Sequence, residues 1–468
     1  MEDRNSMKQV SIFGLGKLGA VIAGCYASRG FQVVGVDVNH SAVASCDRGI
    51  PPVEEPGIED LYRSAGELLS ATMDGTAAVQ ATKATFIAVP TPSETDGAYS
   101  LKYVLEACAV IGQALRKKNQ YHLVVLKSTV LPGASNGTVI PALEQYSGKQ
   151  CGVGFGFCYN PEFIALGNVI HNIFSPDFTL IGESDPSAGA HLMAIHERLL
   201  SKQAPISRMN IVNAEITKLA VNTYVTMKIS YANLLAGLCE RLPDGNVDTV
   251  TAALGRDSRI GPKYIKGGLG YGGPCFPRDN AALLSLARQL GVSFPLAEAT
   301  DQANQEIPLR VANLVAANAP PQGRIAVLGL SYKPDTPVIE ESQSILIAKL
   351  LLQRGFKLQA YDPLAMEESR RELGDRVHFT ESPQACIEGA DIILLATPWK
   401  DFQSIDYGSG NSHRPVVIDC FGLLNGDASN GTRVVRLGVH AAQPEKLDNK
   451  KKLARRNRAM EKADVLGK

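Results

Sequence analysis

Residues 8–19 read Lys-Gln-Val-Ser-Ile-Phe-Gly-Leu-Gly-Lys-Leu-Gly, a short apolar run that ends in a glycine-rich turn. Residues 20–30 are mostly small and apolar, and a second apolar run, residues 31–37, follows directly. This order predicts a buried strand, a tight turn, a helix closed by a glycine and a second strand. It indicates an α/β fold that begins with a βαβ unit.

The turn has the GxGxxG spacing, and an aspartate ends the second strand. In such a unit the first glycine makes the turn, the second lets a pyrophosphate approach the helix N-terminus, and the third lets the helix pack on the strand. The aspartate accepts a hydrogen bond from a ribose hydroxyl and repels a 2′-phosphate, which favours NAD over NADP. The alternative is a degenerate Rossmann unit that contributes only to packing and binds no dinucleotide. The predicted NAD-binding residues of this unit are Gly14, Gly16, Lys17, Leu18, Gly19 and Asp37.

Strand-like runs at residues 84–90 and 123–128 alternate with helical patterns, which predicts a doubly wound parallel sheet over roughly the first 200 residues. Residues 212–241 contain no proline and have apolar residues at helical spacing, so one long helix is expected there. Residues 355–362 parallel residues 30–37, which predicts a second Rossmann-like unit.

We therefore predict two Rossmann-like domains joined by a helical middle part, with boundaries at breaker clusters and composition changes. The predicted segments are an NAD-binding domain (1–205), a central helical and dimerisation domain (206–318), a C-terminal domain (319–444) and a charged, disordered tail (445–468).

Composition excludes several functional classes. The 47 Lys and Arg residues balance 47 Asp and Glu residues, so no overall charge attracts nucleic acid or acidic membranes. The chain has no signal-like segment and no apolar stretch of about 18 residues, which favours a cytoplasmic protein. The nine cysteines include no CxxC pair, so neither a disulfide framework nor a metal site is predicted.

One cysteine lies in an unusual setting. Residues 267–279 read Gly-Gly-Leu-Gly-Tyr-Gly-Gly-Pro-Cys-Phe-Pro-Arg-Asp, which places Cys275 behind five glycines. Backbone N–H groups of such a loop can approach an anion, and the nearby cation and loop dipoles would favour the thiolate. Cys275 is therefore a candidate nucleophile, with a buried structural cysteine in a tight turn as the alternative.

Several motifs occur together with this loop, in an order and spacing that resemble the nucleotide-sugar 6-dehydrogenases, the family of UDP-glucose and GDP-mannose 6-dehydrogenases. The resemblance extends over nearly the whole chain. Besides the glycine turn and the cysteine loop, the motifs begin at Val89 (Val-Pro-Thr-Pro-Ser), Lys127 (Lys-Ser-Thr-Val), Asn160 (Asn-Pro-Glu-Phe), Glu215 (Glu-Ile-Thr-Lys-Leu-Ala-Val-Asn), Arg259 (Arg-Ile-Gly-Pro-Lys) and Leu328 (Leu-Gly-Leu-Ser-Tyr-Lys-Pro-Asp-Thr).

The resemblance implies an NAD-dependent oxidation of a sugar C6 alcohol to a carboxylate in two hydride transfers. Cys275 would form a thiohemiacetal and then a thioester. Lys218 and Asn222 would stabilise oxyanions, Asp279 would act on the hydrolytic water, Glu162 would be an acid/base carboxylate, and Thr129 would help to hold the water. Each of Lys218, Glu162 and Thr129 also has an ordinary structural interpretation, respectively a solvated lysine, a turn cap and a strand-end hydroxyl.

The resemblance also implies binding roles. Thr91 and Thr129 would contact the cofactor, and the substrate would contact Lys218, Asn222, Arg259, Lys266, Gly272 and Lys333. Arg259 would reach the site of a neighbouring subunit, so a homodimer or higher homo-oligomer is expected.

Three positions differ from the usual pattern of the family. Glu340 and Phe421 stand where arginines are usual, and Leu166 replaces a glutamate. We therefore expect catalysis to be better preserved than nucleotide recognition, and we favour UDP-glucose over GDP-mannose or another nucleotide-hexose. The rival hypotheses are a dehydrogenase that oxidises only once and a nucleotide-sugar-binding protein without activity.

Overall fold

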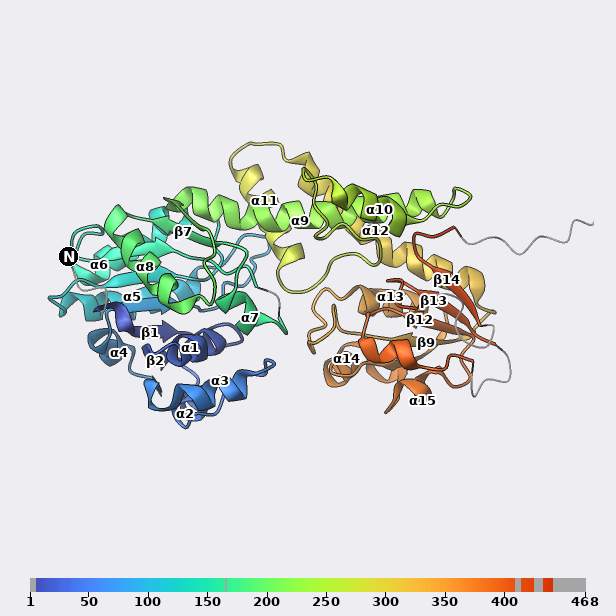
Figure 1. Ribbon diagram of the computed structural model, residues 1–468, viewed down its shortest axis with the longest axis horizontal. Coiled ribbons are helices and arrows are strands. Elements are labelled where there is room, and N and C mark those ends of the chain that lie inside the picture. Colours follow the sequence, from blue (N-terminus) through green and yellow to red (C-terminus); the bar gives the residue numbers. More distant parts are fainter. Residues whose placement is uncertain (1–5, 165, 409–413, 425–431, 441–468) are drawn as a thin grey trace, which may run out of the picture.

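The computed structural model describes residues 6–164, 166–408, 414–424 and 432–440. These residues form two α/β domains at the two ends of an elongated molecule, with a helical part between them (Figure 1). The predicted fold class is therefore confirmed. The predicted charged tail, 445–468, lies outside the described residues.

The first domain contains an eight-stranded sheet in the order β3-β2-β1-β4-β5-β6-β7-β8. All neighbouring strands are parallel except β6 and β7, and the sheet continues beyond the predicted boundary at residue 205. Ligands of such sheets bind at the carboxyl ends of the strands, where the strand order reverses, here between β1 and β4. The strands are β1 (Gln9–Phe13), β2 (Gln32–Val36), β3 (Leu69–Thr72), β4 (Ala84–Ile87), β5 (Leu123–Leu126), β6 (Gly156–Tyr159), β7 (Thr179–Glu183) and β8 (Ile206–Asn210).

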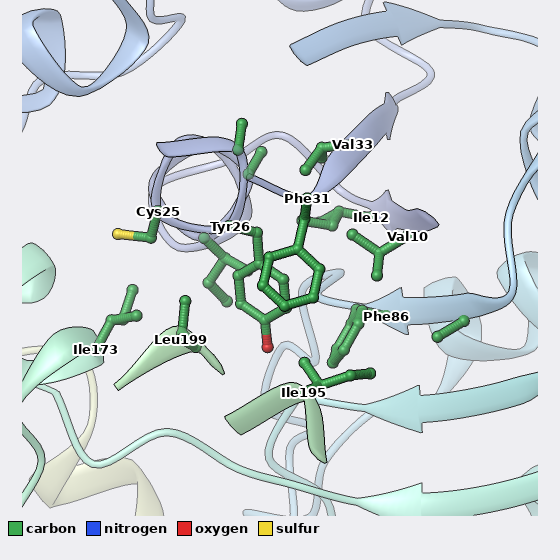
Figure 2. Packing of buried hydrophobic residues seen from close by; sticks show 14 of the residues in the cluster. Val10, Ile12, Cys25, Tyr26, Phe31, Val33, Phe86, Ile173, Ile195 and Leu199 are labelled. Atoms are coloured by element: carbon green, nitrogen blue, oxygen red, sulfur yellow. The ribbon is translucent and has the colours of Figure 1, made fainter. Parts of the chain in front are cut away.

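The helices of this domain cover both faces of the sheet. They are α1 (Gly19–Ser28), α2 (His40–Asp47), α3 (Ile58–Ala65), α4 (Gly75–Ala81), α5 (Lys102–Arg116), α6 (Ile140–Ser147), α7 (Val169–Phe174) and α8 (Pro186–Leu199). Figure 2 shows the core beneath α1, where the ring of Tyr26 lies 5.2 Å from that of Phe31 and 5.1 Å from that of Phe86, centroid to centroid. Ile195 and Leu199 of α8 pack into the same core and fix that helix.

The middle part consists of α9 (Ile211–Cys239), α10 (Val247–Arg256), α11 (Phe276–Gln289) and α12 (Pro295–Asn318). The side chain of Asn210 caps α9 by accepting from the N–H of Asn213. With 29 residues α9 is about 44 Å long, and it packs against β7 as well as α11 and α12. No helix within the described part of the chain is both long and apolar enough to span a membrane.

The second α/β domain contains a six-stranded parallel sheet in the order β11-β10-β9-β12-β13-β14. Its strand order reverses between β9 and β12, so its ligand side is the carboxyl edge there. Its elements are β9 (Arg324–Leu328), α13 (Gln343–Gln353), β10 (Lys357–Tyr361), α14 (Met366–Leu373), β11 (Val377–Phe379), α15 (Pro383–Ile387), β12 (Ile392–Leu395), β13 (Val416–Asp419) and β14 (Arg433–Arg436).

Candidate functional site

The glycine turn after β1 has the geometry that a dinucleotide needs. Gly14 has φ +99°, and a Cβ there would lie 2.7 Å from the carbonyl oxygen of Ala88. A Cβ on Gly19 would lie 1.9 Å from the carbonyl oxygen of Gly14, so helix α1 can pack here only with glycine. A Cβ on Gly16 would meet no heavy atom within 4 Å, which leaves this side of the turn open to a pyrophosphate.

Asp37 follows β2 and faces this turn. Its Oδ2 accepts from the N–H of Leu15 (2.6 Å) and its Oδ1 from the N–H of Asn39 (2.8 Å). An ionised carboxylate has about four acceptor positions, so the half-buried Asp37 can still accept from ribose hydroxyls. The turn and Asp37 together fit NAD.

Exchange of Asp37 for serine is expected to weaken NAD binding by about 10-fold or more, because a hydrogen bond to a charged acceptor is lost. NADP should be used relatively better, since the charge that repels its 2′-phosphate is removed. The measurement is kcat/KM with each cofactor, and Asp37→Asn, which keeps an acceptor but no charge, separates the two effects. Equal use of NAD and NADP by the unaltered protein would contradict the role given to Asp37.

The aspartate at the matching position of the second domain is enclosed. Asp362 is fully buried, and its Oδ2 accepts from the indole N–H of Trp399 at 3.2 Å. Its carboxylate also accepts from four backbone N–H groups, those of Leu330, Ser331, Leu364 and Ala365. A ribose hydroxyl therefore has no access to Asp362, and the second unit is not a second dinucleotide site of the same type.

Cys275 precedes the first residue of α11 and is exposed, whereas the other eight cysteines are buried or half-buried. Its carbonyl oxygen accepts from the N–H of Asp279 at 2.8 Å, which forms the first turn of the helix. The alternative of a buried structural cysteine does not agree with this exposure.

The glycine loop before Cys275 lies against the second α/β domain. The N–H of Gly273 donates to the carbonyl oxygen of Glu340 at 3.0 Å, and a Cβ on Gly272 would lie 2.3 Å from the carbonyl oxygen of Glu341. At its other end, a Cβ on Gly268 would lie 3.1 Å from the carbonyl oxygen of Cys420, just after β13. The loop therefore follows the carboxyl edge of the second sheet.

Polar side chains predicted for the site meet beside this loop. Lys218 and Asn222 lie one turn apart on α9 and are both buried. The Nδ2 of Asn222 donates to Oδ2 of Asp279 (2.6 Å), and the hydroxyl of Tyr99 donates to Oδ1 (2.6 Å). The Nζ of Lys218 donates to the main-chain oxygen of Glu162 at 2.9 Å. The first domain and the middle part thus contribute side chains to one polar site.

The pKa of the Cys275 thiol is raised, whereas the sequence analysis predicts that the thiolate is favoured. Desolvation by the surrounding protein, followed by repulsion from Asp279, raises the pKa of the thiol above its ordinary value, although one side of the residue is exposed. The charges of Lys218 and Arg278 act in the opposite direction and do not compensate. The prediction that the surroundings favour the thiolate is therefore wrong for the protein alone.

The raised pKa predicts how the thiol reacts. Because the thiolate is the nucleophile, alkylation of Cys275 by iodoacetamide should still accelerate as pH rises past the ordinary thiol pKa. Asp279→Asn removes a repelling charge and should make alkylation at pH 8 faster, even though it should slow sugar oxidation. The measurement is the rate of adduct formation by mass spectrometry, with Cys275→Ser as control. Slower alkylation of the Asp279→Asn protein would contradict this electrostatic account.

The other residues predicted to bind the cofactor or the substrate lie in different parts of the molecule. The hydroxyl of Thr91 donates to the carbonyl oxygen of Thr129 (2.8 Å), which joins the segments after β4 and β5. Lys333 donates to the carbonyl oxygen of Leu166 in the first domain. Lys266 is exposed, and so is Arg259, which pairs with Asp257 at 2.6 Å.

Two further side chains contact the site, and the sequence analysis does not single them out. Tyr99, which binds Asp279, lies in a loop with no distinguishing pattern. Lys127 forms an ion pair with Glu162, and the Lys-Ser-Thr-Val motif contains it without indicating this contact. Both contacts join segments that are far apart in the sequence.

Comparison with known proteins agrees with this arrangement. Three models of the UDP-glucose/GDP-mannose dehydrogenase family match successive parts of the chain: the NAD-binding domain (residues 8–200), the central domain (212–306) and the UDP-binding domain (326–426). The UDP-glucose 6-dehydrogenase of Haloferax volcanii is 37% identical over 415 residues, which are 88% of this chain and 96% of that protein. The GDP-mannose 6-dehydrogenase of Pseudomonas putida is 33% identical over 440 residues, 91% of this chain and 98% of that protein.

A solved structure is also similar. The UDP-glucose dehydrogenase from the archaeon Pyrobaculum islandicum superimposes with a TM-score of 0.84 at 35% identity, over 94% of this chain and 100% of that chain. The resemblance seen in the motifs is thus confirmed along the chain. With its NAD-binding first domain, its central helices and its second α/β domain, this chain belongs to the UDP-glucose/GDP-mannose dehydrogenase family of NAD-dependent nucleotide-sugar dehydrogenases.

Proposed function

We propose that this enzyme oxidises UDP-glucose to UDP-glucuronate in two successive two-electron steps, with Cys275 as the covalent nucleophile. The observation that carries the proposal is the setting of Cys275, the only exposed cysteine among the nine, at a helix N-terminus with Lys218 and Asp279 electrostatically coupled to its thiol. A single oxidation to an aldehyde needs no nucleophile, whereas oxidation of an aldehyde does.

The role of Cys275 follows from the chemistry of the aldehyde. When bound, NAD supplies the hydride acceptor, and two molecules are consumed for each sugar. The thiolate adds to the aldehyde carbon, and the former carbonyl oxygen becomes the oxyanion of a thiohemiacetal. Loss of hydride from that carbon gives a thioester, and water then displaces the thiolate to give the carboxylate.

The neighbouring groups would support these steps. The ammonium of Lys218 would stabilise the negative oxygen of each tetrahedral species, with Asn222 on the same face of α9. Asp279 would orient the hydrolytic water, and its carboxylate is itself held by Asn222 and Tyr99. Glu162 would exchange the proton of the C6 hydroxyl, and Thr129 would help to hold the water.

The nucleotide is expected at the carboxyl edge of the second sheet, under the glycine loop. This loop contacts residues after β9 and after β13, which is where parallel sheets bind ligands. Lys333 and Lys266 would then face the diphosphate, and Gly272 would allow close approach of the backbone. Burial lowers the pKa of Lys333, and the charges of Glu55 and Asp335 oppose this effect.

UDP-glucose is the first candidate, supported by the 37% identity to the UDP-glucose 6-dehydrogenase of Haloferax volcanii; that of Bacillus subtilis is 34% identical. GDP-mannose is the second candidate, because GDP-mannose 6-dehydrogenases are 33% to 35% identical.

The test is the number of NADH molecules formed per nucleotide-sugar consumed, with UDP-glucose and GDP-mannose offered in parallel to the purified protein and NAD. Two NADH per UDP-glucose are expected. Two NADH per GDP-mannose would identify GDP-mannose as the substrate instead. One NADH per sugar would favour a single oxidation with a structural Cys275. Binding of both sugars without NADH formation would favour the non-catalytic alternative.

We further propose that the enzyme is a homodimer joined along α9. This helix exposes apolar side chains at spacings of seven, three and four residues, which lie on one face: Tyr224, Tyr231, Leu234 and Leu238, each 51% to 59% exposed. A second copy of the same helix is the partner that fits, since the expected role of Arg259 requires a neighbouring subunit at the site.

Charges on this face should separate the subunits. The double change Leu234→Glu and Leu238→Glu is expected to convert the dimer to monomers in sedimentation velocity, because each buried leucine contributes about 1.5–3 kcal/mol and the new charges would lose their hydration. Leu290→Glu is the control, because Leu290 is 67% exposed but lies after α11. A dimer that survives the double change, or an unaltered protein that is monomeric, would refute the interface.

A further inference from the structure

Two different lysines hold the main chain and the side chain of Glu162. The Nζ of Lys218 donates to its main-chain oxygen at 2.9 Å, and Lys127 forms an ion pair with its carboxylate. The side chain of Lys127 is fully buried and that of Glu162 is 17% exposed. Breaking an ion pair at a buried position is costly, because it leaves an unpaired charge there.

Lys127 is itself held by a chain of hydrogen bonds. Its Nζ donates to Oδ1 of Asn160 at 2.6 Å, and the same Oδ1 lies 2.8 Å from Nε2 of His196. Because a lysine can only donate, the Asn160 atom that it contacts is the oxygen, so Nε2 of His196 must carry a proton. The Nδ2 of Asn160 donates to the carbonyl oxygen of Leu180 at 2.8 Å, which fixes the amide from its other side.

The far end of this chain is anchored in the core of the first domain. His196 lies on α8 between Ile195 and Leu199, which pack into the core beneath α1 (Figure 2). Burial, followed by the charge of Lys127, lowers the pKa of His196 well below its ordinary value, so the imidazole is neutral. Asn160, Glu162 and His196 line one small cavity of about 20 Å³, large enough for about one water molecule.

We propose that Lys127, held by Asn160 and His196, is a positioning residue that keeps the carboxylate of Glu162 away from Lys218. Lys218 already contacts the main chain of Glu162, so a carboxylate released by Lys127 could turn to this second ammonium group. Such an ion pair would occupy the cation that the developing oxyanion needs. This inference rests on the proposed function, because it assigns Lys218 and Glu162 their roles there.

The test is a double-mutant cycle on turnover with Lys127→Met and Glu162→Gln. Glu162→Gln alone is expected to lower kcat by about 100-fold through loss of acid/base catalysis. Lys127→Met alone should lower kcat by at least about as much, with unchanged NAD affinity, because it disables Lys218. In the Glu162→Gln background Lys127→Met should cause no further loss, because no carboxylate remains to pair with Lys218.

A second pair of variants covers the case in which Lys127→Met does not fold. His196→Leu loosens Asn160 and is expected to lower kcat about 3- to 10-fold, again only while Glu162 is present. His122→Leu is the matched control, since His122 is equally buried in the same domain but bonds to Thr85 at 2.8 Å. Both histidine variants should lose similar thermal stability, and only His196→Leu should lose turnover.

The possible results distinguish a failure of the positioning proposal from a failure of the proposed function. If Lys127→Met slows the Glu162→Gln enzyme as much as the unaltered one, Lys127 has a merely structural role and the proposal is refuted while the proposed function stands. If Glu162→Gln turns over at the normal rate, the role of Glu162 fails, and the positioning proposal fails with it. Equal kcat losses in His196→Leu and His122→Leu would likewise overturn the proposal.

Discussion

Cys275→Ser is expected to lower the rate of NADH formation from the nucleotide-sugar by about 1,000-fold or more, whereas NAD binding should remain unchanged. A serine hydroxyl is not ionised at neutral pH and is a much weaker nucleophile than a thiolate, so its addition to the aldehyde should be slow. The glycine turn at which NAD is expected lies in another domain. The measurements are steady-state NADH formation and NAD titration on the same protein.

The control for this variant is Cys151→Ser, because Cys151 is half-buried in the first domain and should not affect turnover. A stronger test is a single-turnover experiment, in which Cys275→Ser should form at most one NADH per site and accumulate the aldehyde. Unchanged kinetics in the Cys275→Ser enzyme would refute the covalent mechanism.

Lys218→Met is expected to lower kcat by about 100- to 1,000-fold with a smaller change in KM, because in the proposed mechanism the ammonium group stabilises charge that develops only in the tetrahedral species. Methionine preserves most of the buried aliphatic stem of Lys218, so the variant should fold. Alkylation of Cys275 at pH 8 should also become slower, since Lys218 lowers the pKa of that thiol.

Lys118→Met is the matched control for this second change. Lys118 is also buried and donates to a main-chain oxygen, that of Val79 at 2.6 Å, but it lies at the end of α5 away from the cysteine loop. Both variants lose a buried ammonium group, and only Lys218→Met should lose turnover. An enzyme that retains its rate without Lys218 would show that another group stabilises the oxyanion.

Local patterns predicted much of the fold, since each βαβ unit is signalled by a short stretch of chain. The glycine turn, Asp37 and the long helix α9 could be recognised because each belongs to a short continuous stretch of chain with a characteristic spacing or periodicity. The antiparallel pairing of β7 could not, because an apolar run does not specify the direction of its partner strand.

The site was predictable only in part, for physical reasons. The clustering of Lys218, Asn222 and Asp279 was implied by the family resemblance and agrees with the observed contacts. The contact of Tyr99 with Asp279 joins residues 180 positions apart, and no local pattern indicates it. The direction of the pKa shift of Cys275 was also not predictable, because desolvation depends on atoms from all sides of the folded protein, whereas the sequence shows only the adjacent charges.

The enclosure of Asp362 has a practical consequence. The indole that bonds to its carboxylate belongs to the sole tryptophan of the chain, located just after β12 at the edge where the sugar nucleotide is expected. Tryptophan fluorescence, excited selectively over that of the 14 tyrosines, therefore has a single origin in the second α/β domain. It can be used to follow nucleotide binding there without added labels. Resonance energy transfer from that indole to NADH would in addition report the distance between the two α/β domains during turnover.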